Sequence, residues 1–111
     1  MSLTAAGLQA SAAGLASAAV KVSLHSALPN WTGSNETTAA RQTPAWTNTN
    51  GVLTLSATEA FTGGAANGAV QYVGLWNSTP AFLGSFQITT GDTTFNSSGA
   101  YTLDNITITY A

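Results

Sequence analysis

Turn residues divide this chain into short segments, and this division limits what it can fold into. After residue 20, clusters of Gly, Pro, Asn and Ser recur about every eight to twelve residues. The segments between them alternate apolar and polar side chains, or are wholly apolar. That spacing is typical of all-β sandwiches and barrels. We therefore predict a mainly β fold, a small antiparallel β-sandwich of about seven short strands preceded by one N-terminal α-helix.

The length of 111 residues suits a single domain with one modest core. We predict one domain over 1–111, with the helix at 1–19 and the β-sandwich at 20–111. Asn50-Gly51 is a strong signal for a two-residue hairpin. Strands are expected at 20–25, 41–46, 52–61, 70–76, 81–89, 93–96 and 101–110. The alternation places Leu53, Leu55, Ala57 and Phe61 on one face of their segment, Phe82, Phe86 and Ile88 on one face of another, and Ile106, Ile108 and Tyr110 on one face of the last.

The run 70–76 is the most apolar of these segments and is expected to be a central strand. A glycine inside a strand indicates a close backbone approach or a bulge. The core-strand motif of this expected strand consists of Val73, Gly74, Leu75 and Trp76.

Residues 1–20 carry no charge and are rich in alanine, which predicts a helix with Thr4 as its N-cap. Gly7 and Gly14 each cost about 1 kcal/mol in a helix relative to alanine, so they suggest close packing against that face. Two interpretations stay open. The helix docks onto another subunit, or it covers an open end of the domain's own core. The stripe at helical spacing consists of Leu8, Ala12, Leu15 and Ala19.

Charge is scarce, at 5% of residues against about 25% in ordinary soluble domains. Burying a neutral polar surface costs less desolvation free energy than burying a charged one. The strand edges of such a protein also lack the charges that discourage pairing with another strand. This favours a protein that lives in an assembly, with a neutral-surfaced monomer as the alternative. The net charge is −2 and the only cations are Lys21 and Arg41, so we expect binding to neither nucleic acid nor membrane.

The stretch 24–41 joins the helical and β parts and holds the only histidine, one of the four acids and one of the two cations. Glu36 and Arg41 could clamp its ends, whereas the simpler interpretation is an exposed loop with a weak ion pair. His25 is the only ordinary base, and no serine lies in a nucleophile-elbow pattern. We predict no enzyme, no catalytic residue, no cofactor and no metal site. The predicted structural loop motif is His25, Pro29, Asn30, Gly33, Glu36 and Arg41.

Three tryptophans allow a second kind of function. Trp31, Trp46 and Trp76 could form a platform that stacks on sugars. The alternative is that Trp76 lies in the core while Trp31 and Trp46 are half-buried, because large aromatic side chains are mostly buried. Asn-x-Ser/Thr triplets recur in the chain, and its richness in Asn and Thr accounts for them without glycosylation.

Several short motifs, in this order, resemble a family of small virion proteins of tailed phages of actinobacteria, described as tail-fibre-like or minor structural proteins. The resemblance covers roughly residues 15–90. Two positions depart from its LHTADPG and YAR patterns: Leu28-Pro29-Asn30 replaces Asp-Pro-Gly, and Ala39-Ala40-Arg41 replaces Tyr-Ala-Arg. The motifs are Leu24-His25-Ser26-Ala27-Leu28-Pro29, Thr32-Gly33-Ser34-Asn35-Glu36, Ala40-Arg41-Gln42, Tyr72-Val73-Gly74-Leu75-Trp76 and Phe82-Leu83-Gly84.

The resemblance implies a non-enzymatic virion structural protein that assembles in the bacterial host cytoplasm. We expect a capsid decoration or minor capsid protein, with a tail-tip or fibre-like component as the alternative and a carbohydrate-binding module third. Other capsid or tail proteins would be its partners, and a homo-oligomer such as a trimer is expected. A cell-surface glycan is the less expected ligand.

Overall fold

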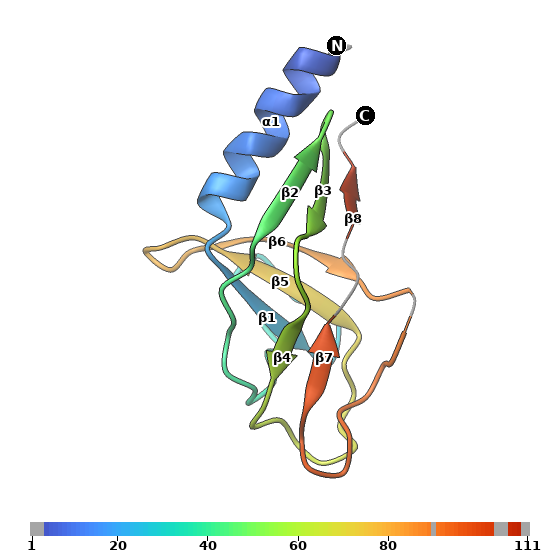
Figure 1. The fold of residues 1–111 in the computed structure, drawn as a ribbon. Helices are drawn as coiled ribbons and strands as arrows, with labels where there is room; N and C mark the ends of the chain where they lie inside the picture. The colour runs from blue at the N-terminus through green and yellow to red at the C-terminus, as the bar shows by residue number, and fades with distance from the viewer. Residues whose placement is uncertain (1–3, 90, 104–106, 110–111) are drawn as a thin grey trace.

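The computed structural model describes residues 4–89, 91–103 and 107–109. Within them, one N-terminal helix precedes eight short strands in three small antiparallel sheets (Figure 1). The predicted mainly β, antiparallel fold with one leading helix is therefore confirmed. The elements are α1 (Ala5–Ala18), β1 (Lys21–His25), β2 (Trp46–Thr49), β3 (Val52–Leu55), β4 (Glu59–Phe61), β5 (Tyr72–Trp76), β6 (Phe82–Gln87), β7 (Tyr101–Leu103) and β8 (Thr107–Thr109).

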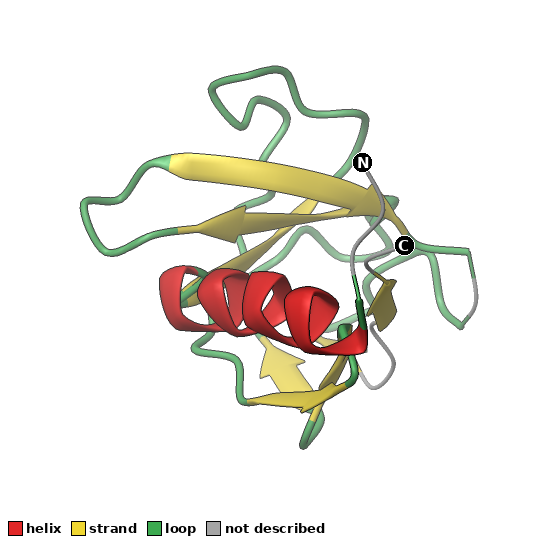
Figure 2. Ribbon diagram, turned by 90° about the horizontal axis from the view of Figure 1, so that it is seen from above, coloured by secondary structure: helices red, strands yellow, loops and turns green. Residues whose placement is uncertain are grey.

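Helix α1 begins as predicted, because the Thr4 side chain accepts a hydrogen bond from the Gly7 N–H at 3.2 Å. It runs alongside the β2–β3 hairpin (Figures 1 and 2). Of the predicted stripe, Ala12 and Ala19 are buried and Leu15 is half-buried against the core, while the Leu8 side chain lies outside the described residues. In the described residues, no helix has the length and apolarity that crossing a membrane requires.

Gly14 does not serve the close packing that the sequence suggested. It is exposed, and a Cβ built on it would meet no atom within 4 Å. We therefore expect Gly14→Ala to raise the free energy of unfolding by about 1 kcal/mol, because alanine loses less backbone entropy in a helix. Urea unfolding monitored by circular dichroism measures this. An unchanged or lower free energy of unfolding would contradict the open surface at this position.

The first sheet has the strand order β1-β5-β6, so the apolar run around β5 is central, as predicted. Leu24 pairs with Val73 and faces the core, whereas the next pair, Ser23 with Gly74, faces the other side of the sheet. The pairing of β5 with β6 shifts register between Leu75 and Trp76. The prediction that Phe82, Phe86 and Ile88 share one face is wrong. Phe86 and Ile88 pack against the core, whereas the register shift places Phe82 beside Trp76 and His25 on the opposite face of the sheet.

The second layer is built from two long stretches that pair with each other. Strand β3 pairs with β8 and β4 pairs with β7, with a register shift of one residue between the two ladders. Strand β2 adds to β3 through a tight turn in which Asn50 and Gly51 have φ of 51° and 89°. Positive φ at both central residues is the type I′ geometry, so the hairpin prediction is confirmed. The buried core between the layers includes Val22, Leu24, Phe61, Val70, Val73, Leu75, Phe95, Tyr101 and Leu103.

Three strand predictions differ from the structure. The second strand begins only at Trp46, and the segment 93–96 makes an isolated bridge from Thr94 to Ala69 rather than a strand. The stretch 52–61 divides into β3 and β4, which leaves Ala57 exposed in the bend between them. Ile106 and Tyr110 lie outside the described residues.

The Asn-x-Ser/Thr triplets have a structural role that composition did not reveal. In three loops the Asn side-chain oxygen accepts hydrogen bonds from the backbone N–H two residues on, from the hydroxyl of that same residue, and from the N–H four residues on. Such bonds hold a turn without any strand pairing, which explains why the chain around Asn96 is a loop. The three sets are Asn30 with Thr32 and Ser34, Asn77 with Thr79 and Ala81, and Asn96 with Ser98 and Ala100.

Candidate interaction surface

The segment 26–36, here called the covering loop, packs on the face of the β1-β5-β6 sheet that points away from the core. Gly33 is its closest contact: a Cβ at this residue would lie 2.6 Å from the Trp76 ring and 2.9 Å from the Phe82 ring. Its φ of +78° also favours glycine. Pro29 is buried in the same loop. The outer face of this sheet is therefore covered by the chain itself.

Beneath the covering loop, a continuous series of hydrogen bonds links the side chains of His25, Ser23 and Trp76. His25 Nδ1 lies 2.8 Å from the Ser34 carbonyl, which can only accept, so Nδ1 carries the proton. His25 Nε2 then accepts from the Ser23 hydroxyl at 2.7 Å, and the Ser23 oxygen accepts from Trp76 Nε1–H at 2.7 Å. All polar atoms of this series are satisfied with a neutral imidazole.

Burial lowers the pKa of His25 below 6.5. The Ser34 carbonyl and the nearby Glu36 carboxylate oppose that shift, and the Arg41 guanidinium adds to it. Both Ser23 and His25 are fully buried. A Cβ at Gly74 would lie 2.5 Å from His25 Nε2 and 2.6 Å from Ser23 Oγ, so the strand backbone closes directly over the pair. This serine–histidine pair is packed as a structural element, with both side chains fully buried.

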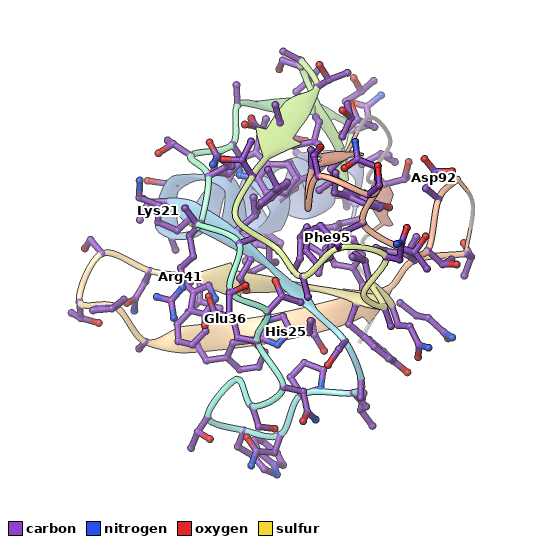
Figure 3. The ribbon with its side chains drawn as sticks, turned by 90° about the horizontal axis from the view of Figure 1, so that it is seen from below. Lys21, His25, Glu36, Arg41, Asp92 and Phe95 are labelled. Carbon is purple, nitrogen blue, oxygen red and sulfur yellow. The ribbon has the colours of Figure 1, made fainter. Side chains whose placement is uncertain are left out.

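The C-terminal end of the covering loop is held by the ion pair that the sequence suggested, between Glu36 and Arg41. Arg41 Nε and Nη2 donate to the two carboxylate oxygens of Glu36, each at 2.8 Å. The same guanidinium stacks 3.6 Å above the Trp76 ring centroid, and the Glu36 carboxylate raises the pKa of Arg41. Figure 3 shows Arg41, Glu36 and His25 gathered in one region. Two-point geometry and stacking make this more than a loose surface contact.

The covering loop and strand β6 together expose an apolar surface. Trp31 is 96% exposed, Leu28 is 64% exposed and Leu83 is 40% exposed. These side chains line a shallow concavity of about 450 Å³, together with Pro29, Asn30, Phe82, Gly84 and Ser85. None of these described lining residues is charged. We call Leu28, Trp31, Leu83 and this concavity the interaction surface.

The exposure of Trp31 corrects one sequence prediction. Trp76 is buried and Trp46 is half-buried, as expected, but Trp31 is not packed against the loop. Gly33 lies directly against Trp76 and Phe82 and Pro29 is buried, whereas residues 30–32 between them are exposed. Asn30 Oδ1 holds that turn by accepting from Thr32 and Ser34.

The structure brings the predicted loop motif and core-strand motif together, although they lie far apart in the sequence. His25, Gly33 and Arg41 all contact Gly74 or Trp76. Helix α1, which carries the predicted stripe, lies against the β2–β3 hairpin, and the stripe residues Leu15 and Ala19 pack in the core cluster that also contains Val73 and Leu75. Ser23 and Phe82 were missed. The alternation around Val22 and Leu24 does place Ser23 on the same face as His25, and this was the available signal.

Within the described ranges, no three His, Asp or Glu side chains gather closely enough to hold a metal ion. No protein-family model, no curated protein and no solved structure matches this chain. The likeness to phage virion proteins therefore remains a prediction from the sequence motifs.

Proposed function

We propose that this chain is a non-enzymatic structural protein of a bacteriophage particle, with a capsid decoration or minor capsid protein as the first choice. The observation that carries the proposal is the interaction surface, in which an almost fully exposed Trp31 stands on a loop fixed from beneath. The sequence motifs that resemble phage virion proteins lie at the end of β1, in the covering loop, in the segment 40–42 and in strands β5 and β6.

The covering loop is already ordered before any partner arrives. Its shape is held by the Asn30 hydrogen bonds, by the contact of Gly33 with Trp76, and by the Glu36–Arg41 pair. A tryptophan held in this way loses little conformational freedom on binding, and tryptophan is among the residues that dominate interface energetics. The surrounding surface is nearly uncharged, so covering it carries little desolvation cost. These properties suit a permanent contact within an assembly.

The same properties suit a tail-tip or fibre-like component, which stays the alternative placement. In either place the partners would be other virion proteins, the chain would be a homo-oligomer, and assembly would occur in the host cytoplasm. A cryo-EM map of the intact particle separates the two. Many symmetric copies on the shell support decoration, a few copies at the tail tip support the alternative, and absence from the particle contradicts both.

A variant links the particle contact to the interaction surface. We expect Trp31→Ala to fold normally, because its side chain is almost fully exposed, and to be lost from purified particles by at least tenfold. Thr102→Ala, an exposed residue of β7 outside the interaction surface, is the matched control and should be incorporated as in the wild type. Quantitative mass spectrometry of particles measures both. Equal incorporation of the two variants would contradict docking through Trp31.

A carbohydrate-binding module is the second candidate, and the exposure of Trp31 is the observation that favours it. A solvent-facing indole can stack on a sugar ring, and this idea would have failed if all three tryptophans were buried. A titration of the purified protein with host cell-wall oligosaccharides, followed by tryptophan fluorescence, tests it. A saturable change that disappears in Trp31→Ala would support sugar binding, and an unchanged spectrum would exclude it for those sugars.

A further inference from the structure

Strand β6 has an open edge. Among the described residues it pairs only with β5, at the end of the order β1-β5-β6. The opposite edge of the same sheet is closed, because β1 is bridged by Gln42 and Glu36. Monomeric proteins usually protect an open edge with charges, and the stretch 80–89 carries none.

The direction of the β6 backbone groups follows from the pairing. The Ile88 N–H donates to the Gln71 carbonyl at 2.8 Å, and in an antiparallel ladder alternate residues of a strand bond to the same neighbour. Phe86 and Ile88 therefore bond toward β5. Ser85 and Gln87 direct their N–H and C=O groups away from β5, toward the open edge. Both residues lie beyond the register shift, in the regular part of the strand.

We propose that β6 pairs with β6 of a second copy of this chain, in antiparallel register across a twofold axis at Phe86. Ser85 of each copy would then lie opposite Gln87 of the other, and these two residues would satisfy each other's free backbone groups. The two three-stranded sheets become one continuous sheet.

Three observations favour a second copy as the occupant. Unpaired backbone donors and acceptors along a strand are matched best by another strand. A twofold axis brings each edge against itself, and this is tolerated here because the edge has no charges to repel one another. Leu28 and Trp31 also flank the start of β6 in the same concavity as Leu83 and Ser85, so they extend the contact with apolar area.

This inference uses the interaction surface but does not depend on a virion role, since it concerns the purified chain. Sedimentation equilibrium is expected to give twice the chain mass of 11.2 kDa at micromolar concentration. Hydrogen exchange should slow at the amides of Ser85 and Gln87 as the concentration rises. A monomer or a trimer at every concentration, or a dimer with freely exchanging amides at these two residues, would overturn it.

Paired charge variants test the register. In the double variant Ser85→Lys/Gln87→Lys, like charges face each other across the axis, and we expect a monomer with at least tenfold weaker association. In Ser85→Lys/Gln87→Glu, the same two positions present opposite charges to the partner, and the dimer should be retained. Both side chains are exposed, so both variants should fold. Equal association of the two variants would contradict this register.

Discussion

Gly74→Ala is expected to lower the free energy of unfolding by about 3 to 4 kcal/mol. Its new methyl group would lie 2.5 Å from His25 Nε2 and 2.6 Å from Ser23 Oγ, so both side chains would have to move. Overpacking of this kind costs about 1 to 3 kcal/mol, and each buried polar group left without a partner adds about 1 to 3 kcal/mol. Neither side chain has space to move into, because both are fully buried beneath the covering loop.

The neighbouring strand offers a matched control for this substitution. Gly84 lies in β6 of the same sheet, and a Cβ on it would meet no atom within 4 Å. Gly84→Ala should therefore leave the free energy of unfolding within about 0.5 kcal/mol of the wild type. Urea unfolding of both variants, followed by Trp fluorescence, measures the difference. Equal losses in the two variants would show that the His25 network is not tightly packed against Gly74.

Stability is expected to fall as the pH drops below about 6.5. The folded state lowers the pKa of His25, chiefly through burial, so the unfolded chain binds its proton at a higher pH than the folded chain does. The free energy of unfolding is then level above pH 6.5 and decreases below it, by at most about 1.4 kcal/mol for each pH unit. Protonation would also place a hydrogen on Nε2, where the Ser23 hydroxyl now donates.

Unfolding curves between pH 8 and pH 5 test this prediction, because His25 is the only histidine and the chain has no cysteine. His25→Gln is the reference variant. It should be less stable than the wild type at pH 7, since it breaks the series of hydrogen bonds from Trp76 to Ser34, but its stability should not decline between pH 7 and pH 5. A wild-type protein with the same flat profile would mean that His25 is protonated in the folded state without penalty.

Local signals predicted a large part of the fold. Thr4 begins the helix, Asn50-Gly51 forms the hairpin, and the strand that contains Gly74 is central and closely approached. Each of these depends on the chemistry of one or two adjacent residues, such as a capping hydroxyl or a permissive glycine. The Glu36–Arg41 pair was also accessible from the sequence, because its members are five residues apart.

The candidate site could not be predicted in the same way, because it depends on contacts between distant parts of the chain. Ser23 meets the Trp76 indole only because the β1–β5 register places Ser23 opposite Gly74. The exposure of Trp31 goes with the placement of its loop, in which Gly33 packs against Trp76 of a strand more than 40 positions away in the sequence. An average preference of tryptophan for burial cannot anticipate such a long-range contact.

The pairing of the strands also determines when the protein can fold during its synthesis. β1 is complete at residue 25, but its partner β5 begins only at residue 72, and β3 and β4 pair with strands that begin after residue 100. Among the ladders that the structure describes, only the β2–β3 hairpin joins two strands that are both synthesised before residue 56. The core can therefore close only after β7 has been made, at residue 103, and β1 has no partner from its own sheet until β5 is complete at residue 76.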